Sequence, residues 1–162
     1  MRQQIKAIVL TVRPSSDRAS VAHLYTRESG RLQLLVHGNK WKNILQPMQI
    51  VQIGTNLHTT KMSSIDYVEL DYFPQQEDIA HYCLRLFMAE ALEKVLRHPM
   101  TDETLFDSLE ELVHEADETA EPAHFPERFL TRFSMLLGFG GGEIEELRDL
   151  KSLEVVRSLS ID

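Results

Sequence analysis

Apolar and polar residues alternate with a period of two along much of the first 73 positions, a spacing typical of half-buried β-strands. Proline and small polar residues separate the alternating stretches and indicate turns. The connection from Arg27 to Gly30 carries a glycine near its end, which suits a hairpin loop with one left-handed residue. The pattern predicts five strands, over residues 5–13, 19–26, 31–37, 47–53 and 65–73.

After residue 74 the apolar positions recur at about 3.6 residues, the period of an α-helix. A wide apolar stripe from Ile79 to Leu96 predicts a buried helix that ends at His98–Pro99. The glycine-rich segment 138–142 ends a later helix, and one last amphipathic helix is expected after it. These signals predict helices over residues 76–98, from residue 101 onwards, over 127–137 and over 144–156.

The order of these elements predicts an α+β protein in which a small β-barrel precedes a helical bundle. Five short strands, with no helix between the first four, favour a five-stranded barrel of the OB type, whose exposed face and loops bind oligonucleotides. An SH3-like barrel is an alternative that strand count does not exclude. We place the barrel at residues 1–73 and the helical domain at residues 74–162.

The net charge changes sign between these two predicted domains. The whole chain carries −8, which is unusual for a nucleic-acid-binding protein. Residues 1–73 hold nine Lys and Arg against five Asp and Glu, a net +4, and the remainder holds eight against twenty, a net −12. A basic module is thus joined to an acidic one, and we expect nucleic-acid binding in the basic module.

A short basic loop around the only tryptophan is the clearest functional signal. Lys40 and Lys42 flank Trp41, a pairing of charge and stacking surface that single-stranded nucleic-acid binders use. The alternative is an ordinary solvated turn with the indole tucked into the end of the barrel, because tryptophan is usually at least partly buried. Further cations of the basic module complete the predicted DNA-binding set. They are Arg13, Arg18, Arg31 and Lys61.

No motif indicates catalysis, a cofactor or a metal site. The glycine run follows a helix and lacks the Gly-Lys-Ser/Thr of a phosphate-binding loop. Cys83 is the only cysteine, and the histidines are not spaced to converge on one ion. We therefore expect no enzyme activity, no cofactor and no structural metal. Because no apolar run approaches a membrane span and no signal peptide is evident, we expect a cytoplasmic location.

Four stretches of the chain are similar to one known family. They are the first strand at 5–12, the hairpin LYTRESGRL at 24–32, the ILQP segment at 44–47 and the LLGF helix end at 136–139. On these residues the chain resembles the RecO family of bacterial recombination mediators, over roughly residues 3–139. It looks like a short member that lacks the family's cysteine-rich zinc segment.

The resemblance implies an OB barrel packed on a helical domain and a role in DNA damage repair. It implies binding and annealing of single-stranded DNA and, together with RecR, help in displacing SSB so that RecA can load. The basic loop of the family falls on Lys40, Trp41 and Lys42. A hydrophobic groove among the helices is expected to receive the acidic tail of SSB, with an arginine for its carboxylate. The residues expected there are Arg85, Leu86, Phe87, Arg128, Arg132 and Phe133.

Two hypotheses follow. The first is a non-catalytic mediator of DNA repair and recombination that binds single-stranded DNA with the barrel and protein partners with the helical domain. The second is a protein-interaction adapter of the repair machinery that does not bind DNA.

Overall fold

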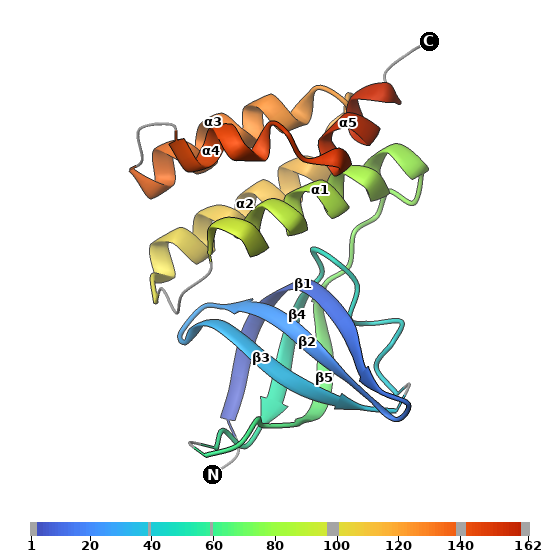
Figure 1. Ribbon diagram of the computed structural model, residues 1–162, viewed down its shortest axis with the longest axis vertical. Coiled ribbons are helices and arrows are strands. Elements are labelled where there is room, and N and C mark those ends of the chain that lie inside the picture. Colours follow the sequence, from blue (N-terminus) through green and yellow to red (C-terminus); the bar gives the residue numbers. More distant parts are fainter. Residues whose placement is uncertain (1–2, 39, 59, 97–100, 139–141, 160–162) are drawn as a thin grey trace.

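Five antiparallel strands build the first half of the molecule (Figure 1). The computed structural model describes residues 3–38, 40–58, 60–96, 101–138 and 142–159. The predicted helix end at His98–Pro99 and the family position Phe139 lie outside these residues. The strands are β1 (Gln3–Ser16), β2 (Ala19–Thr26), β3 (Gly30–His37), β4 (Ile50–Thr55) and β5 (Ile65–Tyr72).

The barrel closes between its two end strands. β1 pairs with both β2 and β4, and the sheet order is β3-β2-β1-β4-β5. Leu35 of β3 forms a parallel bridge to Ser64, just before β5, and the Leu35 N–H donates to the Ser63 carbonyl at 2.8 Å. This circuit of five strands confirms the OB-type barrel expected from the sequence.

The central strand β1 is buried on both faces. Ala7 and Val9 belong to the core inside the barrel, whereas Ile8 and Leu10 pack against the helices. This explains why the four residues 7–10 form a continuous apolar run. At the other side of the sheet, Gly30 adopts φ 67°, and its carbonyl accepts a hydrogen bond from the Thr26 hydroxyl at 2.7 Å, which forms the predicted hairpin loop.

Two strand boundaries differ from the prediction by three residues, more than any other. β1 continues past Pro14 to Ser16, because β4 pairs only with residues 3–8 of β1 and no partner needs an N–H on that edge of Pro14. β4 begins at Ile50 instead of residue 47. Met48 has φ 67° and its N–H donates to the Val9 carbonyl at 2.7 Å, so this residue forms a tight connection and not a strand.

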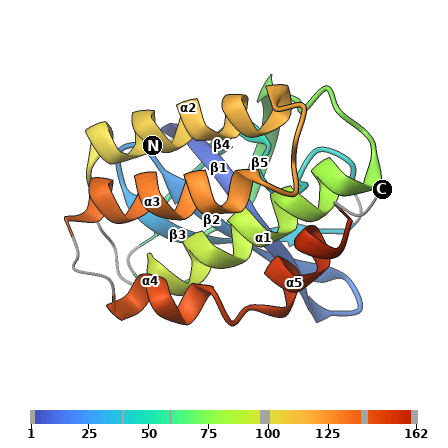
Figure 2. The same ribbon diagram turned by 90° about the horizontal axis from the view of Figure 1, so that it is seen from above.

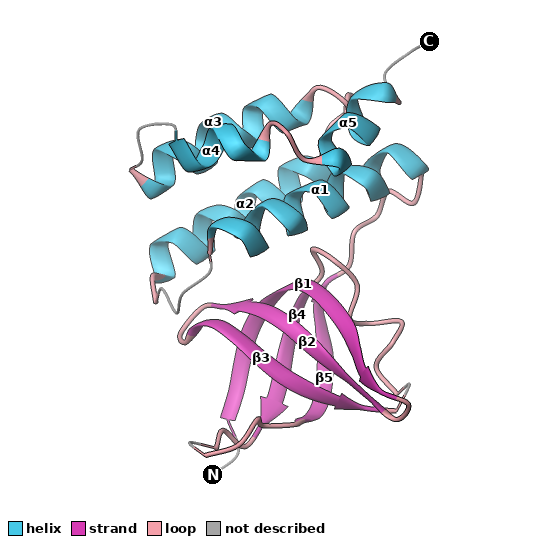
Figure 3. Cartoon of the chain, viewed as in Figure 1, coloured by secondary structure: helices cyan, strands magenta, loops and turns pink. Residues whose placement is uncertain are grey.

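The helices cover one side of the barrel. They are α1 (Ile79–Val95), α2 (Glu103–Glu118), α3 (Phe125–Leu137), α4 (Gly142–Leu147) and α5 (Lys151–Ser158). Figure 1 shows α1 and α2 directly above the barrel and α3, α4 and α5 above them, and Figure 2 shows α1, α2 and α3 running over the sheet. Figure 3 shows strands and helices in separate layers. Among the described residues no helix is long and apolar enough to cross a membrane.

The helix ends are fixed by identifiable side chains. Asp78 accepts a hydrogen bond from the His81 N–H at 3.0 Å at the start of α1, and Asp102 accepts one from the Leu105 N–H at 3.0 Å at the start of α2. The predicted single last helix is wrong: α4 and α5 are separate, because Leu150 has an extended ψ of 135°. Leu147, Leu150, Leu153 and Val156 are buried as the pattern predicts.

The barrel and the helices share one hydrophobic core. Tyr25 of β2 stacks on Phe106 of α2 with ring centroids 5.9 Å apart, and both side chains are fully buried. The connection from β5 to α1 is held by Asp117 of α2. This buried carboxylate accepts hydrogen bonds from the Tyr72 hydroxyl and from the N–H groups of Gln75 and Gln76, the last two at 2.9 Å. The predicted boundary near residue 73 therefore falls in a connection that is attached to α2.

Candidate nucleic-acid interface

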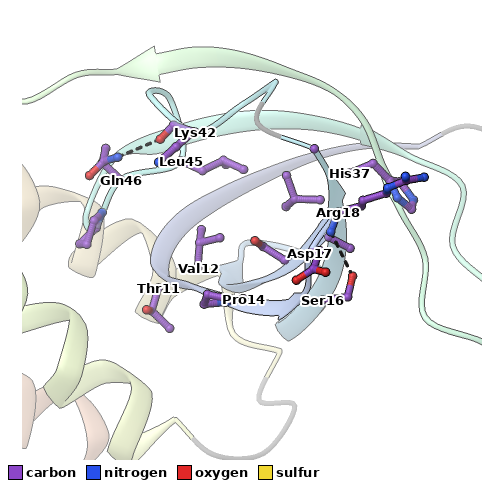
Figure 4. Close-up of a pocket in the computed structure, with 15 residues that line it drawn as sticks. Thr11, Val12, Pro14, Ser16, Asp17, Arg18, His37, Lys42, Leu45 and Gln46 are labelled. Carbon is purple, nitrogen blue, oxygen red and sulfur yellow. Dashed lines mark hydrogen bonds between the residues drawn. The ribbon is translucent and has the colours of Figure 1, made fainter.

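A groove of about 840 Å³ lies at the end of the barrel where the β1–β2 turn, the end of β3 and the β3–β4 loop meet. Its walls combine apolar surface with a few cations. Figure 4 shows Lys42 and Gln46 on one side of the groove and Ser16, Arg18 and His37 on the other. The apolar lining residues are Val12, Pro14, Ala19, Val36, Leu45 and Pro47, and the charged ones are Asp17, Arg18 and Lys42.

Backbone hydrogen bonds position both sides of this groove. The Arg18 carbonyl accepts from the Gly38 N–H at 2.8 Å, and Gly38 has φ 65°, a conformation that glycine adopts without strain. On the opposite side the Gln46 amide donates to the Lys42 carbonyl at 2.8 Å (Figure 4). Leu45 anchors this loop in the barrel core. The two cations are therefore presented by loops with a defined backbone.

A second, smaller hollow of about 230 Å³ continues from the groove. It lies between the end of β3 and the β4–β5 loop and is lined by His58, Lys61 and Met62, among others. His37 lines both hollows, and its Nε2 is 3.0 Å from the Ser64 hydroxyl. Arg18 and Lys42 thus line the groove and Lys61 lines the hollow, and His37 is common to both.

Sequence reasoning missed His37 and His58, which line these two hollows. His37 lies three residues before the predicted Lys40 and His58 three residues before the predicted Lys61, and the fold also brings His37 next to Arg18. The available signal was that His37 ends a predicted strand, where side chains reach the rim of a barrel.

The predicted loop residues Lys40 and Trp41 interact with each other. The Lys40 ammonium lies 5.0 Å from the centre of the Trp41 ring. Trp41 is half-buried and packs against the barrel core, and its carbonyl accepts hydrogen bonds from the N–H groups of Ile44 and Leu45 at 3.1 and 3.0 Å. Trp41 is thus neither fully solvated nor fully buried, because it packs against the barrel core and remains partly accessible.

Two predicted DNA-binding residues do not reach the groove. Arg13 and Arg31 both pair with Glu93 of α1, at 2.9 and 3.3 Å from its Oε1 atom. Arg31 also donates to the carbonyls of Glu93 and Leu96, at 2.7 and 2.9 Å. Burial lowers the pKa of Arg31, and the charge of Glu93 opposes this effect. These guanidiniums lie at the junction between barrel and helices.

The predicted partner groove is not formed by its two phenylalanines. Phe87 and Phe133 are 0% exposed, and Phe129 lies between them with ring centroids 5.9 and 5.4 Å away. Their positions on the inner faces of α1 and α3 place them in the helical core, because both belong to the apolar stripe of their helix. Leu86 is half-buried.

The three predicted arginines of the helical domain differ in their surroundings. Arg85 donates to the Gln76 carbonyl at 3.0 Å, and Arg132 pairs with Glu115. Arg128 is exposed and lies 5.8 Å from the centre of the Phe125 ring.

In the part of the chain that the structure describes, no group of three or more His, Cys, Asp or Glu is arranged to hold a metal ion.

Residues 1–73 match the family model described as recombination protein O N terminal. The barrel is therefore similar to the N-terminal domain of recombination protein O. The chain is 29% identical over 160 residues to the DNA repair protein RecO of Porphyromonas gingivalis strain ATCC 33277, an alignment that covers 86% of this chain and 64% of that protein. It is 29% identical over 153 residues to the DNA repair protein RecO of Phocaeicola vulgatus, covering 85% and 61%.

The chain spans less than two thirds of the length of these RecO relatives. The similarity nevertheless extends beyond the barrel into the helices, because it covers most of this chain. The match to the recombination protein O N-terminal model and the OB-type barrel therefore agree with each other.

Proposed function

We propose that this RecO-family protein is a non-catalytic DNA repair and recombination protein that binds single-stranded DNA in the groove at the end of its barrel. The observation that carries the proposal is the position of Arg18 and Lys42 on opposite sides of one groove with apolar walls. Cations at the rims pair with phosphates, and apolar surface between them accommodates unpaired bases.

The shape and composition of the groove favour a single strand over a duplex. Unpaired bases can lie against Val12, Leu45 and Pro47, whereas the bases of a duplex are stacked inside and are not available to such surface. Lys61 extends the basic surface into the second hollow beyond His37. Trp41 is half-buried beside Lys40, and stacking of a base on its ring would have little sequence preference.

The proposal is tested by the salt dependence of binding to a fluorescently labelled oligothymidylate. Neutralising one phosphate contact on a single strand releases about 0.7 counterions, so the double variant R18Q/K42Q should make the slope of log affinity against log salt shallower by about 1.4. The matched control is K151Q/R157Q, which removes the same charge from exposed positions on α5. An R18Q/K42Q slope equal to that of the parent would show that the groove is not the DNA site.

The protein partners that we propose are SSB, RecR and, indirectly, RecA. This part of the proposal is based on the similarity to RecO. For the SSB tail, the exposed Arg128 is the best placed of the three predicted arginines, since Arg85 and Arg132 are engaged by Gln76 and Glu115. Titration calorimetry with an SSB tail peptide should give binding that R128Q weakens. Equal binding by R128Q and the parent would remove Arg128 from the site.

A further inference from the structure

A charged cleft of about 470 Å³ lies between the outer face of the barrel and α1, separate from the groove. Arg13 of β1, Arg31 of β3 and Glu93 of α1 meet there. A single oxygen, Oε1 of Glu93, lies 2.9 Å from Arg13 Nη2, 3.3 Å from Arg31 Nη2 and 3.5 Å from Nδ1 of the buried His23. Two guanidiniums thus converge on one carboxylate.

The cleft carries more positive than negative charge. Its charged lining residues are Arg13, Arg31, Lys94, Glu90 and Glu93, a net +1. Burial lowers the pKa of His23, and the charges of Arg13 and Arg31 lower it further, whereas the charge of Glu93 raises it. The net effect is a lowered pKa, so His23 adds no charge near neutral pH. A carboxylate shared by two arginines leaves them with unbalanced charge that an added anion can satisfy.

The two arginines differ in how firmly they are held. Arg31 is tied to α1 through the carbonyls of Glu93 and Leu96, so it stays in place whether or not the carboxylate is charged. The Arg13 side chain is 61% exposed and pairs with Glu93 from the open side of the cleft. Arg13 is therefore the guanidinium that an anion entering the cleft from solution reaches first, once the charge of Glu93 is removed.

The cleft and the groove lie on the two faces of the same strand end. Val12 and Pro14 line the groove, and Arg13 between them lines the cleft, since successive side chains of a strand point to opposite faces. The cleft is therefore adjacent to the groove along β1, on the other face of the strand.

We propose that this cleft is a second phosphate-binding site for the same single strand and that the Glu93 carboxylate occupies it as an internal competitor. This inference rests on the proposed function, because the strand in the groove supplies the phosphates. The N–H groups of arginine that donate to a carboxylate also donate to a phosphate, so Glu93 takes the place that a phosphate would fill. Removing its charge makes both guanidiniums available to the DNA backbone.

The variant Glu93→Gln tests the inference, because glutamine keeps the size of the side chain and an oxygen acceptor for Arg31. Two additional phosphate contacts should steepen the slope of log affinity against log salt by about 1.4. Between 50 and 200 mM salt the variant should then lose about sevenfold more affinity than the parent loses. A slope equal to that of the parent overturns the proposal.

Two comparisons separate competition from a general charge effect. Glu90→Gln also removes one negative charge from the cleft, but Glu93 still pairs with both arginines in this variant. It should therefore leave the salt slope unchanged. R13Q should leave the slope of the parent unchanged, because Glu93 already occupies Arg13, yet lower the slope of E93Q by about 0.7. Equal effects of E90Q and E93Q, or of R13Q in both backgrounds, contradict the competition.

A second variant covers the case in which E93Q loosens the contact between barrel and helices, which circular dichroism would reveal. Gln33 lines the cleft at an exposed position of β3, so Q33K adds a cation without disturbing the core. If the strand crosses the cleft, Q33K should steepen the slope by about 0.7, whereas T131K on the exposed face of α3 should not.

The outcomes also separate this inference from the proposed function. If R18Q/K42Q weakens DNA binding but E93Q and Q33K do not strengthen it, the groove is supported as the DNA site and the cleft is rejected. If the parent does not bind DNA, both sites are rejected. An acidic peptide that binds E93Q more tightly than the parent, without any gain in DNA affinity, would make the cleft a protein contact and contradict the proposal.

Discussion

Two groups of basic side chains on the barrel have opposite surroundings. Members of the first group face the helices, and each pairs with a carboxylate of α1 or α2. Members of the second group lie at the groove, at the hollow beside it or on the β3–β4 loop, and no ion pair joins them to a carboxylate within the described residues. The first group is Lys6, Arg13, Arg27 and Arg31, and the second is Arg18, Lys40, Lys42 and Lys61.

The difference shows how an acidic chain can present a basic surface. The helical half neutralises the barrel cations that it covers, as in the pairs Lys6–Glu110 and Arg27–Asp107, both at 2.9 Å. The β1–β2 turn, which carries Arg18, points away from the helices (Figure 1), and we propose that the cations of the second group are available to a ligand. Changes at the junction should therefore alter stability, and changes at the groove should alter binding.

The largest expected effect is at the junction. Asp117→Asn removes a buried charge that accepts hydrogen bonds from Tyr72, Gln75 and Gln76, and it should lower the free energy of unfolding by about 3 kcal/mol. Tyr72→Phe removes only one donor and should cost about 1 kcal/mol. Urea denaturation followed by circular dichroism measures both. A loss below about 1 kcal/mol for D117N would show that Asp117 does not hold the connection to α2.

The same carboxylate predicts a pH dependence. Burial alone would raise the pKa of Asp117, but hydrogen bonds from Tyr72, Gln75 and Gln76, with the charge of Arg85, outweigh it and hold the pKa below its ordinary range. Its contribution is complete above the unfolded pKa of about 3.9 and is lost as the pH falls through the folded value. The stability difference between parent and D117N should shrink from pH 6 to pH 3. A difference that stays constant contradicts this assignment.

The junction also shows which parts of the fold follow from sequence. The period-two and period-3.6 patterns predict the strands, the helices and the buried leucines of α4 and α5, because burial on one face leaves a periodic trace. The continuation of β1 past Pro14 to Ser16 and the left-handed Met48 depend on pairing across the sheet. A proline ends a strand only where a partner needs its N–H, and that partner is far away in the sequence.

The candidate site was predictable to a lesser degree. Arg18, Lys42 and Lys61 lie on the predicted loops and meet on one surface, as charge counting suggests. Arg13 and Arg31 are also cations near the ends of predicted strands, as Arg18 is, yet they face α1. The carboxylate that neutralises them lies 62 residues from Arg31 along the chain, and no local pattern connects the two.

The next largest effect concerns Trp41, the only tryptophan of the chain. Stacking on a base contributes about 1 to 3 kcal/mol, so W41A should weaken oligonucleotide binding accordingly while leaving the salt slope nearly unchanged. W41F keeps an aromatic ring and should lose less. In the parent, the fluorescence of Trp41 should be quenched when oligonucleotide is added. Unchanged fluorescence at saturating DNA would place the indole away from the bound strand.

The smallest effects come from a matched pair of lysines. K6Q removes the ion pair with Glu110 at the junction and should cost less than about 1 kcal/mol of stability, with no change in the DNA salt slope. K42Q should do the reverse, with unchanged stability and a slope shallower by about 0.7. The comparison fails if both lysines change the same property.

The salt dependence of the parent's affinity for a labelled oligothymidylate tests whether the unpaired barrel cations bind single-stranded DNA. Four unneutralised cations, Arg18, Lys40, Lys42 and Lys61, each contacting one phosphate, predict a slope of about −2.8, which a variant of the paired Lys6 and Arg27, K6Q/R27Q, should retain. A slope near zero, or no binding at micromolar protein and low salt, would contradict the account and favour an adapter that does not bind DNA.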